Sequence, residues 1–310
     1  MIISASRRTD IPAFYSDWFI NRLKDGYVVV PNPFDPKNCS RIVINPRVVD
    51  CIVFWTKNPA PLLNKLDHLK NYKYYFQFTL NPYDDDIEQN IPLLSKRIET
   101  FKKLSDKIGR GKVIWRYDPI VTNRKYNIQF HHDFFSKIIS LLKDYTGRCM
   151  IGPVFHYKKI SKILENNNVK PLEYEEAKCI TKRFVQLGNS NNVEIGTCTE
   201  LIDLTSFGAK KLACIDKLFI ENITGYSIDE KKDKNQRPEC KCMESIDIGI
   251  YGTCLHGCIY CYANTTKNKI DLNVKLHDKS SPKLIGNITD SDNITDRKIK
   301  INGEKQRKLF

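Results

Sequence analysis

Apolar residues along this chain fall into two patterns, short continuous runs and longer stretches with helical spacing. The runs predict buried strands at residues 1–6, 51–55, 74–80, 112–117, 150–155 and 193–197, with shorter extended segments at 27–31 and 41–45. The stretches predict helices at 14–23, 93–104, 130–142 and 173–187, and one through Leu62, Leu63 and Leu66. Strands that alternate with helices are typical of parallel βαβ units. We therefore expect an α/β fold whose strands form a partial or complete (β/α) barrel.

Polar residues follow most of the predicted strands. The first strand leads into Arg7-Arg8-Thr9-Asp10, the next into Thr56-Lys57-Asn58, and a later one into Asp118-Pro119. In a barrel of parallel strands, the residues that perform the chemistry lie at the carboxyl ends of the strands. We therefore expect the functional residues of the N-terminal part to lie in these short polar stretches.

The pattern changes after residue 226. Residues 1–226 carry the predicted barrel strands and helices, and 227–264 form a cysteine-rich segment with one predicted strand at 246–251. Residues 265–310 show little periodicity, and we interpret them as a C-terminal extension. A chain of 310 residues, 41% of them hydrophobic, can bury one large α/β core. We therefore treat 1–310 as a single domain.

The net charge and the lengths of the apolar runs bear on the possible binding partners and on the cellular location. The formal net charge is +14, and a basic surface can attract nucleic acid. Lysine is abundant along the whole chain, however, so a biased composition explains the charge equally well. No apolar run approaches the length of a membrane span, and the N-terminus lacks the basic-then-apolar order of a signal peptide. We expect a cytoplasmic protein with no membrane contact.

Three cysteines stand close together near the C-terminus. Cys254, Cys258 and Cys261 have the spacing C-x3-C-x2-C, so their thiolates can meet at one soft metal centre. A [4Fe–4S] cluster normally takes four cysteines, so a site with three leaves one iron open to another ligand. The alternative is a structural zinc site, although zinc sites more often combine two C-x2-C pairs or add histidines.

This motif resembles that of the radical S-adenosylmethionine enzymes, in which an aromatic residue, here Tyr260, precedes the last cysteine. The string Cys258-Ile259-Tyr260-Cys261-Tyr262 is most similar to the spore photoproduct lyase branch. The string from Ser245 to Tyr251, which leads into the cysteines, resembles the family filed as domain of unknown function 1848. The resemblance to that family extends along the full chain.

The resemblance implies a reaction and a set of roles. Cys254, Cys258 and Cys261 would hold a [4Fe–4S] cluster, S-adenosylmethionine would bind its open iron, and a 5′-deoxyadenosyl radical would act on an unidentified substrate. An electron donor such as flavodoxin or ferredoxin would reduce the cluster. Tyr260 and Tyr262 flank the last cysteine, where tyrosines of spore photoproduct lyase take part in hydrogen relay. The remaining cofactor contacts would come from Ser6, Lys57, Thr79 and Arg116.

Each of these contacts has a chemical reason. The methionine carboxylate needs a cation, which Lys57 can supply, and the amino group needs acceptors, which Ser6 and Thr79 can supply. Arg116 could bind a ligand or pair with Asp118. Ala5 stands beside Ser6 where spore photoproduct lyase has its hydrogen-donating cysteine, which argues against lesion repair by that donor.

The order of these features along the chain is unusual. Radical S-adenosylmethionine enzymes place the cysteine loop after the first barrel strand, whereas here it lies near the C-terminus. The strand ends at Ser6, Thr56-Lys57 and Arg116-Tyr117-Asp118-Pro119 resemble those of later strands in that barrel. Circular permutation, with 246–251 as the structural first strand, explains this order. The alternative is a cluster-binding module attached to an unrelated barrel.

Four further cysteines remain near the motif or after predicted strands: Cys198, Cys214, Cys240 and Cys242. Four thiolates are what a second iron–sulfur cluster or a zinc ion requires, although each cysteine alone could be a buried thiol.

Two functions follow from these features. One is a radical S-adenosylmethionine enzyme with a catalytic and an auxiliary cluster. The other is a non-enzymatic iron–sulfur or zinc protein that binds nucleic acid through its basic surface.

Overall fold

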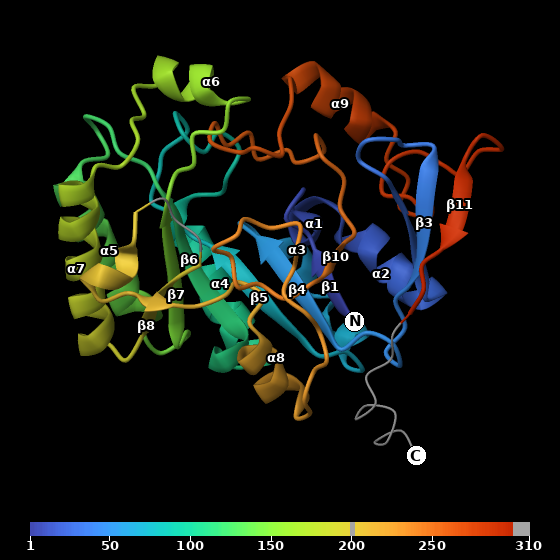
Figure 1. The fold of residues 1–310 in the computed structure, drawn as a ribbon, viewed down its shortest axis with the longest axis horizontal. Coiled ribbons are helices and arrows are strands. Elements are labelled where there is room, and N and C mark those ends of the chain that lie inside the picture. The colour runs from blue at the N-terminus through green and yellow to red at the C-terminus, as the bar shows by residue number, and fades with distance from the viewer. Residues whose placement is uncertain (199–201, 300–310) are drawn as a thin grey trace.

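A computed structural model describes residues 1–198 and 202–299, and its centre is one sheet of eight parallel strands (Figure 1). In their order across the sheet, the strands are β10 (Ile246–Asp247), β1 (Ile2–Ala5), β4 (Cys51–Thr56), β5 (Tyr74–Thr79), β6 (Val113–Ile120), β7 (Arg148–Pro153), β8 (Glu194–Thr197) and β9 (Lys210–Lys211). Every neighbouring pair is parallel, so all the carboxyl ends lie along one edge. Because β10 lies beside β1, the C-terminal strand borders the N-terminal one.

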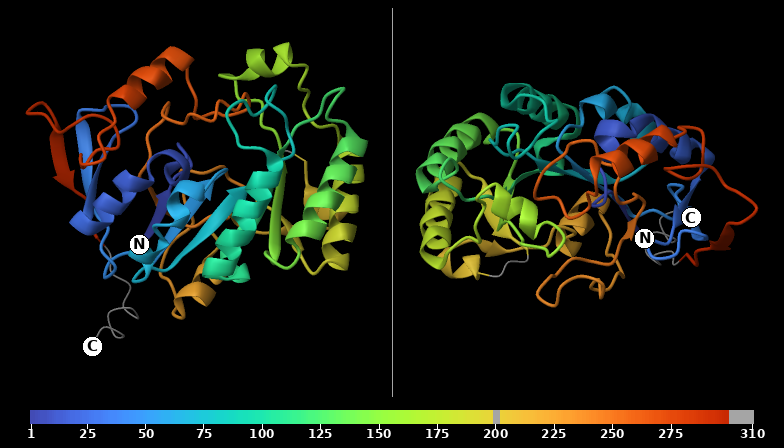
Figure 2. Two further views of the ribbon diagram at one scale, coloured as in Figure 1. Left: turned by 180° about the vertical axis from the view of Figure 1, so that it is seen from behind. Right: turned by 90° about the horizontal axis from the view of Figure 1, so that it is seen from above.

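Helices connect the strands, and α4, α5 and α7 lie along one face of the sheet (Figure 2). The helices are α1 (Ile11–Phe14), α2 (Ser16–Asp25), α3 (Ala60–Leu63), α4 (Leu94–Ile108), α5 (Ile128–Leu142), α6 (Ser161–Asn166), α7 (Tyr174–Ser190), α8 (Lys217–Thr224) and α9 (Lys267–Lys275). Short 3₁₀ turns are η1 (Leu66–Leu69), η2 (Arg110–Lys112) and η3 (Leu204–Phe207). Side-chain caps mark the starts of two α-helices: Asn127 caps α5, and Glu173 forms a capping box with Glu176 at α7.

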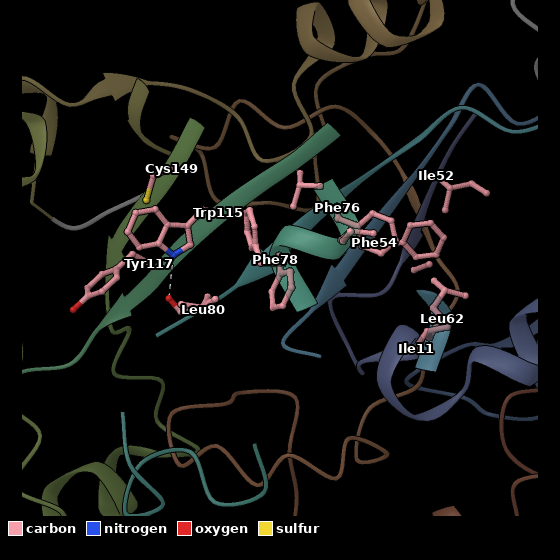
Figure 3. Close-up of a cluster of buried hydrophobic side chains, with 14 of the residues drawn as sticks. Ile11, Ile52, Phe54, Leu62, Phe76, Phe78, Leu80, Trp115, Tyr117 and Cys149 are labelled. Atoms are coloured by element: carbon pink, nitrogen blue, oxygen red, sulfur yellow. Dashed lines mark hydrogen bonds between the residues drawn. The ribbon is translucent and has the colours of Figure 1, made fainter. Parts of the chain in front are cut away.

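The sheet is buried on both faces, and alternate residues of each strand point to different cores. Phe54, Phe76, Phe78 and Trp115 point toward the helices and form the large core, where their rings stack on one another and on neighbouring helices (Figure 3). The residues between them in the strands point to the opposite face. There Val53, Tyr75, Ile114 and Met150 pack against residues 213–242, so this segment covers the second face of the sheet.

A second, three-stranded sheet joins the two ends of the described chain. Its strands are β2 (Tyr27–Pro31), β3 (Asn38–Val43) and β11 (Asn293–Asp296), in the order β11-β3-β2. The side chain of Trp18 in α2 donates to the carbonyls of Ser281 and Lys283 at 2.9 and 3.1 Å. Part of the predicted C-terminal extension is therefore tied to the N-terminal helices, while residues 300–310 lie outside the described part.

The prediction of a mixed α/β fold with parallel strands is confirmed. Within the described residues no strand pairing joins β9 to β10, so the sheet has two free edges rather than the closure of a complete barrel. The strand expected at 246–251 is shorter, because the Asp247 carboxylate binds the Arg7 and Gly249 amides and the chain turns away there. The helix expected after Pro59 breaks at Asn64 into α3 and η1.

None of the helices in residues 1–198 and 202–299 combines the length and the apolar character that crossing a bilayer would require.

Candidate functional site

A cavity of about 590 Å³ opens at the carboxyl ends of the parallel strands, where the sequence places its polar stretches. Its walls come from the ends of β1, β4, β5, β6 and β7 and from four cysteine-bearing segments, at 198, 214, 240–242 and 254–261. Each residue that the sequence proposed for a site lines this one cavity. These residues are Ser6, Lys57, Thr79, Arg116, Cys198, Cys214, Cys240, Cys242, Cys254, Cys258, Cys261, Tyr260 and Tyr262.

Residues 252–264, here named the cysteine loop, form one side of the cavity. Cys254 and Cys258 are buried and Cys261 is half-buried. Burial raises the pKa of Cys254 to about 12 and raises the pKa values of Cys258 and Cys261 as well. A cation that binds here must therefore replace the thiol protons, as soft metal centres do. The donor set of three sulfurs suits such a centre.

Long-range contacts hold the cysteine loop against the sheet. Nε2 of His256 lies 2.8 Å from Oδ2 of Asp10, and the same carboxylate accepts from the amides of Ala13 and Lys57. The Asn90 amide donates to the His256 carbonyl at 2.9 Å. Gly257 has φ +68°, and a Cβ there would lie 2.9 Å from the Gln89 side chain, so glycine suits this position. These contacts and the local backbone conformation hold the loop against the sheet.

A buried carboxylate, Glu88, connects the cysteine loop to Lys57. Oε1 of Glu88 accepts from Nζ of Lys57 at 2.7 Å and also from the Tyr260 hydroxyl. Nη1 of Arg97 lies 3.6 Å from the other oxygen. Burial opposes ionisation of Glu88, but the two cations nevertheless hold its pKa below the ordinary value. Lys57 lies 5.4 Å from the centre of the Tyr260 ring, so its ammonium faces the loop but already has an anionic partner.

The two tyrosines beside Cys261 differ in their surroundings. Tyr260 is fully engaged with Glu88, and burial raises its pKa well above the ordinary value. Tyr262 is 38% exposed, and its hydroxyl donates to the Arg7 carbonyl at 3.2 Å. Both tyrosines line the cavity, and Tyr262 is the more exposed of the pair.

Asp247 supports the site through its bonds to Ser6 and Arg7, which line the cavity, and the sequence did not single it out. Its carboxylate accepts hydrogen bonds from the hydroxyls of Ser4 and Ser6 and from the Arg7 amide at 2.8 Å. The Ser6 hydroxyl in turn accepts from the Arg8 amide at 2.9 Å. Ser6 therefore lines the cavity but already binds Asp247, which links β10 to β1.

The second cysteine group comprises Cys198, Cys214, Cys240 and Cys242, and it lies in the same cavity. The Cys198 sulfur is 3.8 Å from that of Cys240 and 3.6 Å from that of Cys242. Hydrogen bonds from the neighbouring thiols, that of Cys214 first, lower the pKa of Cys198, and the contact with Cys198 raises the pKa of Cys214 to about 12. The group therefore gathers thiol side chains that interact with one another, and thiolates are ligands that soft metal ions prefer.

Two arginines stack on one tryptophan between the two cysteine groups. The guanidinium carbons of Arg7 and Arg116 lie 5.7 and 5.2 Å from the centre of the Trp55 ring. Arg7 is within electrostatic reach of both Cys242 and Tyr262. Arg116 donates to the Cys214 sulfur at 3.1 Å and pairs with a neighbouring carboxylate. Arg116 therefore contacts the second cysteine group.

The residues that sequence reasoning missed, Asp247 and Glu88, are single acids in irregular segments. One signal could have identified Asp247: it lies in the strand predicted at 246–251, which leads into the cysteine motif. No local pattern marks Glu88, whose partner Tyr260 is 172 positions away.

Comparison with known proteins identifies one family. The family model described as "Domain of unknown function (DUF1848)" matches residues 2–263, which is most of the chain and includes both cysteine groups. No curated protein and no solved structure gave a significant match.

Proposed function

We propose that this chain, which belongs to the family described as domain of unknown function (DUF1848), is an enzyme of the radical S-adenosylmethionine type. Cys254, Cys258 and Cys261 would hold a [4Fe–4S] cluster, and S-adenosylmethionine would occupy the adjoining cavity. When bound, this pair of cofactors supplies one-electron cleavage of the sulfonium, which yields a 5′-deoxyadenosyl radical for attack on a substrate.

The observation that carries this proposal is the spacing of the loop thiols around the cavity. Among the described residues, the sole set of three metal-ligating groups with all ligand atoms within 4.8 Å lies in the second cysteine group. The loop cysteines line the same cavity but do not form such a set. Because each thiolate of a [4Fe–4S] cluster binds a different iron, its sulfurs stand further apart than the ligands of a single ion. The loop thiols are therefore not arranged around a single ion, and their C-x3-C-x2-C spacing supports the cluster.

The cavity has room for the second cofactor. Its volume of about 590 Å³ lies within the range of small-molecule sites. Thr9 lines the cavity, and its buried hydroxyl has no hydrogen-bond partner among the described residues. A polar ligand in the cavity would satisfy this group, since buried polar atoms are rarely left unpaired.

The surrounding residues have separate tasks in this proposal. Lys57 would bind the methionine carboxylate as a point charge, and Glu88 would hold the ammonium in place from behind. Tyr260 would position Glu88, and Tyr262, which is accessible, would be the tyrosine that contacts the substrate. Thr79 lines the cavity as a candidate acceptor for the amino group, whereas Ser6 would act through its bond to Asp247.

The sheet order supports circular permutation of a radical S-adenosylmethionine barrel. β10 leads directly into the cysteine loop and pairs in parallel with β1, followed by β4, β5, β6 and β7. Read from β10, the strands follow the expected order, with the cluster-bearing strand first. Reduction by a flavodoxin or ferredoxin, and an unidentified substrate, complete the proposal.

Reductive cleavage of S-adenosylmethionine tests this function. The protein would be reconstituted anaerobically with iron and sulfide and reduced with dithionite, and 5′-deoxyadenosine would be measured by mass spectrometry. We expect formation that depends on Cys254, Cys258 and Cys261 but not on the exposed Cys179. A reconstituted protein that retains its iron but forms no 5′-deoxyadenosine would refute the enzyme. Tight nucleic-acid binding by that protein would then favour the non-enzymatic alternative.

A further inference from the structure

The second cysteine group gathers sulfurs from segments that are far apart in the chain. Cys198 follows β8, Cys214 follows β9, and Cys240 and Cys242 belong to a stretch between α8 and β10 with little regular structure. Nevertheless, the sulfurs of Cys198, Cys240 and Cys242 all lie within 4.8 Å of one another. Hydrophobic packing alone does not require three thiols to converge.

The distances between these sulfurs identify the kind of centre. A tetrahedral zinc ion with bonds of about 2.3 Å to sulfur places its ligands about 3.8 Å apart. The observed separations from Cys198, 3.8 Å to Cys240 and 3.6 Å to Cys242, match this value. The sulfurs of a [4Fe–4S] cluster are separated by the width of the cube, because each binds its own iron. The spacing favours one ion over the second cluster.

We infer that the second cysteine group is a mononuclear, four-thiolate site for one divalent ion of the zinc class, built into the wall of the cavity. Cys198, Cys240 and Cys242 would bind the ion, and Cys214 would close the tetrahedron. Binding displaces the remaining thiol protons, so the ion and four thiolates carry a net charge of −2.

Cys214 is the natural fourth ligand, although its sulfur lies outside the set of three that fall within 4.8 Å. Its thiol interacts directly with those of Cys198 and Cys242. The hydroxyl of Tyr75 and the amide of Gln77 both donate to the Cys214 carbonyl at 2.7 Å, which holds the backbone in place. Rotation of the side chain is then the change that brings this sulfur onto the ion.

Hydrogen-bond donors around the sulfurs suit a negatively charged centre. The Ile215 amide donates to the Cys242 sulfur at 3.4 Å, and the Cys242 amide donates to the Cys240 sulfur at 3.5 Å. The Arg116 guanidinium donates to the Cys214 sulfur at 3.1 Å, and Arg7 lies near Cys242. Such donors stabilise thiolate ligands and fix their orientation.

The consequence is a structural clamp that faces the reaction cavity. Four protein ligands leave no open position, so this ion would not bind substrate. It would join the ends of β8 and β9 to the segment that continues into β10 and the cysteine loop. The inference does not rest on the enzyme proposal, because it depends on different residues.

Cobalt titration tests the site directly. Full-length protein would be stripped of metal, kept reduced under argon, and titrated with Co²⁺ alone, without iron or sulfide. We expect one Co²⁺ per chain, with the visible absorption of a tetrahedral cobalt–thiolate complex, displaced by one equivalent of Zn²⁺. Cys242→Ser should lose this spectrum, whereas Cys179→Ser, at an exposed thiol, should keep it. Cys214→Ser should weaken binding at least tenfold.

A triple variant separates this inference from the enzyme proposal. C254S/C258S/C261S should lose all cluster iron but keep the single Co²⁺ or Zn²⁺. Iron and acid-labile sulfide retained by this variant would show a second cluster and overturn the inference. The inference would also fail if the folded, reduced wild-type protein bound no stoichiometric ion. If Cys242→Ser does not fold, mass spectrometry of alkylated wild-type protein replaces it, and Zn²⁺ should protect Cys198, Cys240 and Cys242 from alkylation.

Discussion

The two cysteine groups that share the cavity have opposite relations between sequence and space. The loop cysteines lie within one segment, 254–261, yet their sulfurs do not converge as ligands of one ion do. The second cysteine group is spread over 198–242, yet three of its sulfurs converge tightly. Close spacing in the sequence therefore does not indicate a small centre. A loop can surround a large cofactor, while dispersed residues can meet at one ion.

The two groups also differ in what holds them in place. The cysteine loop is tied to the sheet by the contact of His256 with Asp10 and by the amide of Asn90. The second cysteine group belongs partly to a stretch that is short of regular structure, in which Lys232 and Met243 form one isolated bridge. We therefore expect the cysteine loop to keep its position without the proposed cofactor, whereas the second cysteine group would depend more on the proposed ion.

The largest expected effect is the loss of S-adenosylmethionine cleavage when a cysteine of the cysteine loop is replaced. Cys258→Ala should reduce 5′-deoxyadenosine formation to background and remove the iron of one cluster, because a buried ligand is lost. The ion of the second cysteine group should remain, as measured by its zinc content. Cys179→Ala, at an exposed thiol in α7, is the matched control. Unchanged cleavage in Cys258→Ala would remove the proposed role of the loop.

The next effect is a change in stability, and it comes from the second cysteine group rather than from the cysteine loop. Cys240→Ser should lower the unfolding free energy of the zinc-loaded protein by a few kcal/mol, since binding energy at such a site contributes to folding. Thermal unfolding with and without a zinc chelator measures this. The Tm of the wild-type protein should fall when zinc is removed, whereas the Tm of Cys240→Ser should be the same with and without the chelator. Equal Tm values for wild type with and without zinc would contradict the clamp.

Lys57→Met isolates the cofactor contact on the loop side. It should weaken S-adenosylmethionine binding by about 10- to 100-fold, the 1.5–3 kcal/mol typical of a hydrogen bond to a charged group. Cluster iron should stay at the wild-type level, because Lys57 is not a ligand. Lys65→Met removes a lysine that pairs with Asp17 outside the cavity and serves as the control. Equal affinities in the two variants would exclude Lys57 as the carboxylate partner.

Arg116→Met decides which group this arginine serves. Because its guanidinium donates to the Cys214 sulfur, we expect about tenfold weaker Co²⁺ binding at the second cysteine group. The matched control is Arg148→Met, since Arg148 pairs with Glu194 and Asp216 away from the cavity. A loss of S-adenosylmethionine affinity with unchanged Co²⁺ binding would instead assign Arg116 to the cofactor.

The smallest effect is a pH dependence on the loop side. The pKa of Glu88 is lower in the folded protein than its ordinary value of 4.5, despite burial, because of Lys57 and Arg97. Its contribution to stability is therefore complete above about pH 4.5 and is lost as the pH falls through the lower, folded pKa. Urea unfolding of metal-free protein between about pH 3 and pH 6 should show this loss in wild type. The unfolding free energy should depend less steeply on pH in Glu88→Gln than in wild type. The same dependence in both proteins would contradict this contribution of Glu88.

Much of the fold could be predicted because its strands are long apolar runs. The segments that became β4 and β5 are apolar or aromatic apart from Gln77 and a threonine at each C-terminal end, and both were predicted to within one residue at each end. Short elements were harder to predict. β9, with two residues, was not predicted, and β10 is shorter than the strand expected at 246–251, because Asp247 binds amides there instead of continuing the ladder. Closure of the sheet depends on how distant edges meet, which no local pattern records.

The common location of the proposed residues was predictable for a geometric reason. Lys57 follows β4 and Arg116 lies in β6, and residues toward the carboxyl ends of parallel strands meet at one edge. The cysteines carry their own signal. The contacts that organise the site were not predictable. The Asp247 bond to Ser6 spans 241 positions, and Glu88 is an ordinary acid until the fold buries it between Lys57 and Tyr260.

The electron paramagnetic resonance spectrum of the reduced, reconstituted protein, recorded with and without S-adenosylmethionine, tests the central claim most directly. A three-cysteine loop leaves one iron open, so addition of S-adenosylmethionine should change the spectrum in wild type and in Cys240→Ser alike. No signal should remain in C254S/C258S/C261S. A cluster spectrum that S-adenosylmethionine leaves unchanged would contradict an open iron in the cavity, and with it the proposed enzyme.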